Sequence, residues 1–276
     1  MAMERCGRIW AGFPLGRPAR RFKRVPGRND MLERVRKALR RPSSGNPSVR
    51  DLQTQFPKLE GVVTPIPPEQ LVATFEAEFA KVSGSPHRAS TVAELEGILR
   101  AILQEAQATS AVLTRNPLLS QLGLQARLHA WGKSAVFWPS RPAGAVETSE
   151  EMAYRNQCFS AGVGISGVDF VLAETGSLVL SSPTEGSQLA SLSPPVHVAL
   201  YRREQVLAIL DEVLERHSLS GNPDARGVGR STVFITGPSR TADIEQILIR
   251  GVHGPKNVHA VLVEESCLAD PGTSKA

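Results

Sequence analysis

The sequence predicts an α/β protein whose open, mostly parallel sheet is flanked by helices. Helical segments with one apolar face alternate along the chain with short apolar segments rich in Val, Leu and Ala. Parallel strands are buried on both faces, so they show unbroken apolar runs of this kind. The chain has 276 residues, of which 41% are hydrophobic, enough for one large or two small domains with a proper core.

The amino-terminal residues differ from the rest of the chain in charge. Residues 1–28 contain eight Lys or Arg residues and one Glu, a net charge of +7, whereas the whole chain carries +5. The remaining chain therefore has a net charge of −2, which does not favour nucleic-acid binding. Residues 1–28 show no helical period and no secretory signal. We interpret them as a basic tail or an incorrectly assigned start, and we favour a start near Met31.

Cysteine usage argues against several cofactor sites. Cys6, Cys158 and Cys267 are far apart in the sequence, and no CxxC pair occurs. The sequence therefore shows no ligand run for an iron–sulfur cluster or a zinc ribbon, and no disulfide framework. A reducing cytoplasm is the expected location, and no segment approaches the roughly 20 apolar residues of a membrane span.

The first half of the chain predicts helices separated by short strands. A helix is expected from Met31, and residues 43–68 read as a linker rich in Pro, Gly and Ser. An amphipathic helix opens at Pro68, and the capping-box residues Thr91 and Glu94 precede another. Strands are expected at 110–113 and 134–138, a helical turn begins at 116–117, and Thr148 caps a helix that ends near residue 159.

The second half predicts mainly strands. Residues 168–173 and 177–181 flank the turn Glu174-Thr175-Gly176, which is a hairpin or bulge signal. Further strands are expected at 196–201, 233–236 and 258–264. A helix is expected over about 204–217, with an apolar face made by Val206, Ile209, Leu210, Val213 and Leu214.

The segment VFITGPSRTADIE, residues 233–245, predicts an anion site. It reads as a strand, a turn at Gly237, and a helix that opens with Ser239, Arg240 and Thr241. A helix amino terminus offers unpaired N–H groups and a positive dipole end, and an arginine there can clamp a carboxylate or phosphate. The alternative is a plain strand-to-helix turn in which Ser239 or Thr241 is the N-cap.

Three further segments are candidates for ligand contacts. Gly162–Gly167 matches GxGxxG, but it follows a helix and leads into a strand, which is the wrong context for a dinucleotide site. Its glycines predict a loop in which Gly164 lets the backbone approach a ligand or a neighbouring strand. Glu174 reads equally as a general base or nucleophile and as a solvated turn acid. The polar segment 181–187 suits a ligand lid or a plain surface loop.

Histidine spacing does not predict a metal site. His197 lies in an apolar strand, where a hydrogen-bonded core residue is more usual than a catalyst. His253 follows the helix expected from Arg240 and either caps it or points into a site. His259 lies six residues further on, and no carboxylate stands at ligand spacing, so no metal is expected.

Several of these segments together carry a family resemblance. The elements AETGSLVL, PPVH, GPSRTADIE and GVHGP occur in this order between about residues 162 and 263. This succession resembles the LUD-domain family, and within it the lactate utilization protein C type, with weaker similarity upstream to about Met31. The resemblance implies a fold similar to ribose-5-phosphate isomerase, glucosamine-6-phosphate deaminase and CoA-transferases, the NagB/RpiA/CoA-transferase-like fold.

The resemblance also implies a site. Proteins of that fold bind anionic substrates at the carboxyl ends of parallel strands. On this chain that points to 237–241, 162–167 and 174–176, with His197 and His253 as further candidates. CoA-transferases use a Glu near a Gly-containing strand end as nucleophile, and Glu174 is similar in that limited sense.

The resemblance further implies a role in oxidising L-lactate to pyruvate beside two iron–sulfur partner proteins. This chain has no cluster ligands and no flavin or NAD motif, so no cofactor is expected in it and the clusters are expected in the partners. We interpret the chain as a non-redox subunit that binds a carboxylate or other anionic ligand. The alternative is a stand-alone enzyme of phosphosugar isomerase or CoA-transferase type. The sequence leaves open whether catalysis occurs on this chain and whether it forms a homo-oligomer.

From these observations we divide the chain into four segments. They are the basic tail or misassigned start at 1–28, a helix and irregular arm at 29–67, the LUD-type α/β domain at 68–266, and a tail at 267–276.

Overall fold

A computed structural model describes residues 28–39, 65–139, 148–219, 231–242 and 248–268. The chain divides into two units, Met1–Val63 and Thr64–Ala276. In the first unit, helix α1 (Arg28–Leu39) presents the exposed side chains of Met31, Leu32 and Val35. Most of the predicted basic tail, linker and C-terminal tail lies outside the described residues.

A six-stranded parallel sheet is the centre of the second unit, in the order β1-β12-β7-β4-β2-β3. The α/β prediction is confirmed at this level. The strands of this sheet are β1 (Ser85–Ala89), β2 (Ser110–Leu113), β3 (Ser134–Phe137), β4 (Val163–Ser166), β7 (Val196–Tyr201) and β12 (Asn257–Val263).

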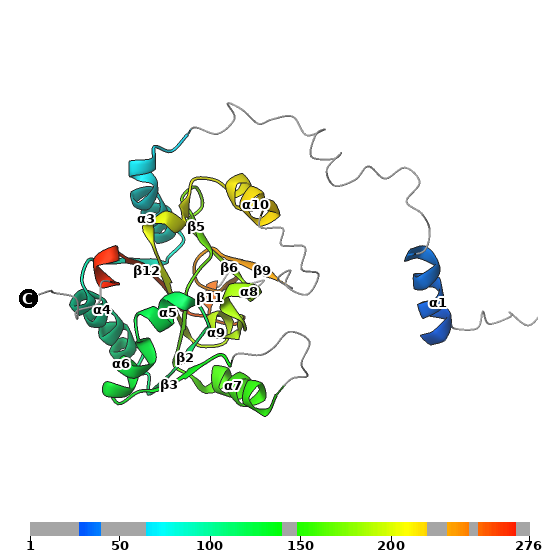
Figure 1. Cartoon of the computed structure of the whole chain (residues 1–276), viewed down its shortest axis with the longest axis horizontal. Coiled ribbons are helices and arrows are strands. Elements are labelled where there is room, and N and C mark those ends of the chain that lie inside the picture. The colour runs from blue at the N-terminus through cyan, green and yellow to red at the C-terminus, as the bar shows by residue number, and fades with distance from the viewer. Residues whose placement is uncertain (1–27, 40–64, 140–147, 220–230, 243–247, 269–276) are drawn as a thin grey trace, which may run out of the picture. The chain divides into compact units, whose positions relative to one another are not determined.

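Helices cover both faces of this sheet (Figure 1). The alternate residues Val196, Val198 and Leu200 of β7 pack in one cluster with the apolar sides of α4, α5 and α6. Ala199 and Tyr201 point to the opposite face, where they pack with α3. The helices are η1 (Pro68–Gln70), α3 (Leu71–Lys81), α4 (Val92–Glu105), α5 (Pro117–Gln121), α6 (Leu124–Ala130), α7 (Ser149–Ser160), α8 (Ser182–Glu185), α9 (Leu189–Leu192), η2 (Arg203–Gln205), α10 (Leu210–Leu219) and η3 (Glu265–Cys267).

A second sheet of four strands, in the order β8-β5-β6-β9, packs near α3. Its strands are β5 (Phe170–Leu172), β6 (Ser177–Ser181), β8 (Val206–Leu207) and β9 (Thr232–Ile235). The predicted hairpin is confirmed, because β5 and β6 are antiparallel. Its turn lies against α3: a Cβ added at Gly176 would come within 2.3 Å of Phe79 N.

Local sequence signals account for several helices. Phe75 and Phe79 of α3 are fully buried and stack with ring centroids 5.4 Å apart. The Thr91 hydroxyl accepts the Glu94 N–H at the start of α4. Thr148 begins α7 with a complete capping box. Caps of this kind satisfy the first free N–H groups of a helix, so these starts follow from sequence.

The helix predicted over 204–217 is wrong in its first half. Val206 is buried in β8 and pairs with Val171 of β5, and α10 begins only at Leu210. Val213 is buried, but Leu210 and Leu214 are 40% and 54% exposed. Pairing with β5 provides Val206 with strand hydrogen bonds and a buried environment, which outweighs the helical spacing.

The helix predicted to open at Ser239 is also wrong. Arg240–Ala242 form strand β10, which pairs antiparallel with β11 (Leu248–Arg250). The segment between them, which includes Asp243, lies outside the described residues. The preceding strand β9 joins the second sheet through β6 and does not extend the parallel one.

The glycine run at 162–167 is a strand and not the predicted loop. β4 takes up Val163–Ser166 between β2 and β7. A Cβ on Gly164 would lie 1.7 Å from the Ala190 carbonyl oxygen, so glycine here admits the close packing of α9 on the sheet. The prediction of a close backbone approach is therefore correct, but the neighbour is a helix.

Candidate functional site

The segments that carry the family resemblance meet beside the amino ends of β7 and β12. Ser239 N–H donates to the Pro255 carbonyl at 2.9 Å, and His253 N–H donates to the Ser239 hydroxyl at 3.3 Å. Lys256 N–H donates to the Pro195 carbonyl at 2.7 Å. The segments around Pro195, Ser239 and Pro255 are thus joined by hydrogen bonds beside the amino ends of the strands.

The predicted Glu174–Gly176 turn is linked to the same region through hydroxyl groups. The Thr175 and Ser177 hydroxyls lie 2.8 Å apart, and the Ser177 and Thr236 hydroxyls lie 2.6 Å apart. Thr236 directly precedes Gly237. This chain of three hydroxyls connects the hairpin turn to the loop in which the anion site was predicted.

Gly237 and Arg240 both contact the chain just after α3. Gly237 has a φ of 82°, and a Cβ there would lie 2.4 Å from the Val82 carbonyl oxygen. The Arg240 guanidinium donates to the same carbonyl. Val82 follows α3 and precedes β1, so this region lies at the amino edge of the parallel sheet and not at its carboxyl edge. The expected location of the 237–241 segment is therefore wrong.

The remaining polar candidates of this region differ in exposure. Thr241 is half-buried and pairs with Ile249 in the β10–β11 ladder. His253 is exposed on the loop before β12. Ser239 is half-buried between these two segments. The region thus has a covered base and a solvent-facing side that includes His253.

Glu174 caps a helix in this structure. Its carboxylate accepts the Leu210 N–H at 2.8 Å, at the first residue of α10. An acidic side chain is favoured there by the free N–H groups and by the helix dipole. The geometry therefore gives Glu174 a structural partner.

His197 is fully buried on the central strand β7. Its Nε2 lies 2.8 Å from the Ser166 hydroxyl, and its Nδ1 has no hydrogen-bond partner among the described residues. Burial, and then the nearby His259, lower the pKa of His197 to about 3. The ring is therefore neutral at physiological pH, as expected for a histidine enclosed in the core.

A pair of histidines lies on the opposite face of the sheet. His87 Nε2 and His259 Nδ1 are 3.0 Å apart on the neighbouring strands β1 and β12. Burial lowers the pKa of both rings, that of His259 to about 4. Within the described ranges, no group of three or more His, Cys, Asp or Glu side chains is placed to hold a metal ion.

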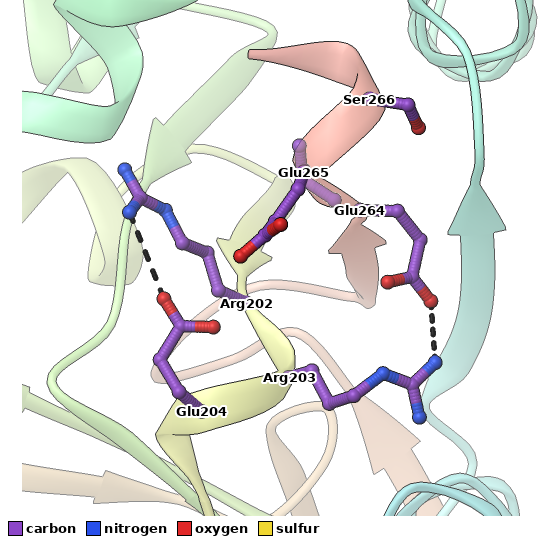
Figure 2. A pocket seen from close by; sticks show the side chains of 7 residues that line it. Arg202, Arg203, Glu204, Glu264, Glu265 and Ser266 are labelled. Carbon is purple, nitrogen blue, oxygen red and sulfur yellow. Dashed lines mark hydrogen bonds and ion pairs between the residues drawn. The ribbon is translucent and has the colours of Figure 1, made fainter. Parts of the chain in front are cut away.

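A surface pocket of about 540 Å³ lies beyond the carboxyl ends of β7 and β12. It is lined by two arginines and three glutamates: Arg202, Arg203, Glu204, Glu264 and Glu265. Figure 2 shows the two arginines turned toward different glutamates, with Arg203 2.5 Å from Glu264 and Arg202 3.6 Å from Glu204. These opposite charges largely balance one another within the pocket.

A buried carboxyl group lies at the carboxyl ends of β2 and β4. Glu185 is 0% exposed and accepts the Thr114 hydroxyl at 2.5 Å and the Gly167 N–H at 3.1 Å. Its other oxygen accepts the Asn116 side-chain amide. Burial raises the pKa of Glu185 to about 7 even though these three donors lower it, and Asp169 adds to the rise.

This place is the switch point of the sheet. From β2 the chain continues to β3 on one side, and from β4 it continues toward β7 on the other side. Open α/β sheets bind ligands in the crevice outside the carboxyl ends of strands at such a point.

Sequence reasoning missed this carboxyl group and its donors. Glu185 falls in the polar segment 181–187, which the sequence did not resolve between a ligand lid and a surface loop. The available signal was Thr114 and Asn116 directly after the strand ending at Leu113, together with Gly167 directly after β4. Only the strand order shows that these residues are neighbours.

This chain belongs to the LUD domain family, whose match covers residues 72–263. That range contains all six strands of the parallel sheet, together with Glu174, Glu185, Arg240 and His253.

Relatives in this family carry a functional name. Lactate utilization protein C of Exiguobacterium sp. is 28% identical over 248 residues, which is 87% of this chain and 97% of that protein. Lactate utilization protein C of Halalkalibacterium halodurans is 27% identical over 198 residues, covering 71% of this chain and 80% of that protein. A crystal structure of a DUF162 family protein from Deinococcus radiodurans has a TM-score of 0.49 at 17% identity, covering 72% of this chain and 99% of that one.

Among the helices of the described ranges, none combines the length and the apolar character that crossing a bilayer requires.

Proposed function

We propose that this protein is a lactate utilization protein C-like component of a system that oxidises L-lactate to pyruvate. It acts there as a non-redox subunit beside iron–sulfur partner proteins and binds a carboxylate or other small anion. The observation that carries this proposal is the alignment with a protein named lactate utilization protein C over 97% of that relative's length. An alignment of this extent includes the whole domain and not only a shared motif.

The cysteines support the placement of the redox centres in partner proteins. Cys158 and Cys267 are buried, and the Cys267 thiol contacts the Ala89 carbonyl oxygen at 3.3 Å. Burial raises the pKa of Cys158 to about 11, which disfavours the thiolate that ligates a cluster. Neither side chain is presented as an iron ligand in this arrangement.

The anion contacts in this proposal lie at the amino edge of the sheet. Arg240 donates to Val82, and its planar guanidinium has further N–H donors for a carboxylate. His253 is exposed on the adjoining loop, and the hydroxyls of Ser239 and Thr175 belong to the same region. Gly237 and Thr241 flank Ser239 and Arg240 in the same segment, whereas Gly164 packs against α9 and His197 bonds Ser166 in the core.

The test is anaerobic, dye-linked oxidation of L-lactate by the two iron–sulfur partners, with and without this protein. Full activity and co-purification should both require it. Arg240→Ala should lower the activity of the complete system at least several-fold, because a charged contact to the anion is lost. Arg100→Ala is the matched control, since Arg100 lies on α4 over the Trp131 ring on the opposite face of the sheet.

Two results would count against the proposal. If the partners oxidise lactate fully without this protein, its proposed role as a subunit is rejected. Equal activity of the Arg240→Ala and Arg100→Ala variants would reject the proposed anion contact of Arg240, but not the proposed role as a subunit.

We also infer a fold of the NagB/RpiA/CoA-transferase-like kind, which is supported by the parallel sheet covered by helices on both faces. The alternative function is therefore a stand-alone phosphosugar isomerase or CoA-transferase with Glu174 as base or nucleophile. In that case Glu174→Gln should abolish turnover by the isolated protein. Because an amide oxygen can still accept the Leu210 N–H, the variant should remain folded. Unchanged turnover in Glu174→Gln would reject this alternative.

A further inference from the structure

We propose that Thr114, Asn116 and Gly167 form a binding site for the carboxylate group of a small organic acid, and that Glu185 of α8 is its intramolecular competitor. This site, the carboxylate niche, lies at the opposite edge of the sheet from Arg240. The inference does not depend on the proposed role in lactate oxidation.

The three donors of the carboxylate niche are arranged for a carboxylate. Thr114 Oγ1 and Gly167 N both donate to Glu185 Oε2, and Asn116 Nδ2 donates to Oε1. Both oxygens of one planar carboxylate are therefore bonded at once. A carboxylate accepts on both of its oxygens, whereas a neutral amide would place its NH2 group against one of these donors and a hydroxyl offers a single oxygen.

These donors are held in place by the fold, independently of Glu185. Asn116 Oδ1 accepts the Leu118 N–H at 3.0 Å as the N-cap of α5, which turns Nδ2 toward the niche. Thr114 N–H donates to the Ile165 carbonyl at 3.0 Å and so continues the pairing of β2 with β4. A Cβ at Gly167 would lie 2.2 Å from the Asn116 side chain, so only glycine fits there. The niche is thus preorganised, which favours binding.

The occupant Glu185 is carried by a short helix. Glu185 ends α8, a helix of four residues, and Gly186 follows with a φ of 78°. The α8 backbone is tied to the β2 end through Arg115, whose N–H donates to the Glu185 carbonyl at 3.2 Å and whose guanidinium reaches Ser182 O at 3.4 Å.

The position of the niche supports a ligand role. It lies between the carboxyl ends of β2 and β4, where the chain direction diverges and where ligands bind in open α/β sheets. An organic acid that enters would replace the Glu185 carboxylate group for group, and α8 would move outward. Glu185 would then regain water, which favours its charged form.

The test uses Glu185→Ala, which removes the competitor and keeps all three donors. Sodium acetate and L-lactate are titrated against the melting temperature of the full-length variant, with acetamide and sodium chloride as controls. At about ten times its Kd the bound acid should raise the melting temperature by about 3 °C or more. The rise should be absent with acetamide, which lacks the second acceptor oxygen.

Two further variants test whether the rise in melting temperature depends on the niche. Glu94→Ala is the matched control, because it also removes a carboxylate that accepts a backbone N–H, that of Ser90, outside the niche. Adding Thr114→Val to Glu185→Ala removes one donor and should abolish most of the rise. Equal shifts in Glu185→Ala and Glu94→Ala, or no shift in either, would overturn the proposal.

The unmodified protein provides a second readout in case Glu185→Ala does not fold. Amide hydrogen exchange is measured with and without a high concentration of acetate. Acetate should speed exchange over residues 182–188, because α8 is displaced, while the Gly167 amide stays protected by the new carboxylate. Unchanged exchange over 182–188 would overturn the proposal.

Discussion

At the scale of single residues, Glu185 makes the stability of this protein depend on pH. Its pKa is raised from an ordinary 4.5 to about 7, chiefly by burial. Between these values the folded state holds a proton that the unfolded state has lost, so the free energy of unfolding falls as the pH rises. A shift of this size corresponds to about 3 kcal/mol in total.

Glu185→Gln should remove this component. Denaturant unfolding at several pH values between 4.5 and 8 should show a smaller loss of stability with rising pH in the variant than in the unmodified protein. The buried His197 and His259 act in the opposite direction, since their lowered pKa values reduce stability as the pH falls below 6.5. Both histidines are present in both proteins, so the difference between the two curves isolates Glu185. Parallel curves would contradict the assignment.

At the scale of elements, the contact of α9 with β4 depends on one missing side chain. Gly164→Ala places a methyl group 1.7 Å from the Ala190 carbonyl oxygen, so α9 must move away from the sheet. Overpacking of this kind costs about 1–3 kcal/mol, and the melting temperature should fall by several degrees.

Gly97→Ala is the control for this change. Gly97 lies inside α4, and a Cβ there meets no atom within 4 Å. Alanine favours a helix interior over glycine by about 0.5–1 kcal/mol, so this variant should melt slightly higher. Both variants are measured by calorimetry. If Gly164→Ala melts as high as Gly97→Ala, α9 can move away from β4 without loss of stability, and this prediction is wrong.

Two secondary-structure elements were predicted incorrectly from the sequence. Residues 206–207 and 240–242 lie in segments with helical spacing or capping residues, yet both pair as strands. Short strands take their hydrogen bonds from distant partners, such as β5 for Val206, and local spacing does not report those partners. Longer helices with caps, such as α4 and α7, are specified locally and were predicted correctly.

At the scale of the whole molecule, the second unit should fold without the first. All buried members of the hydrophobic clusters described for the chain lie between Val72 and Cys267. A protein of residues 64–276 should therefore melt within about 3 °C of the full chain, because the core is unchanged. Differential scanning calorimetry on both proteins measures this.

A longer truncation is the control. Starting the chain at residue 83 also removes α3, whose Phe75 and Phe79 are fully buried. Deleting two buried aromatic side chains costs about 3–5 kcal/mol each, so this protein should fail to fold cooperatively. A cooperative transition in the second protein, or a large loss of stability in the first, would contradict the role assigned to each segment.

The candidate site was only partly predictable. The sequence identified Ser239, Arg240, His253 and the turn at Glu174 as segments of interest, and hydrogen bonds do bring the 239 and 253 segments together. The helix expected from Ser239 and the carboxyl-end location expected for 237–241 were wrong, because Arg240–Ala242 pair with β11 and the segment bonds residues that precede β1 and β12. Glu185 was overlooked because nothing in a hydroxyl-rich loop indicates that its carboxylate is buried.

The family resemblance rests on the order of several motifs along the sequence. By itself, the sequence also determined the α/β class, the capped helices and the apolar strands β2, β3, β7 and β12 of the parallel sheet, but not β1 or β4. These depend on spacing, capping and composition, which are local properties of the chain. Only the tertiary structure decided that Glu174 caps α10, that Gly164 admits α9, and that Thr114, Asn116 and Gly167 converge on Glu185. The reason is physical: burial, pKa and hydrogen-bond partners depend on residues brought together across the sheet, and the order of its strands is not encoded by any one segment.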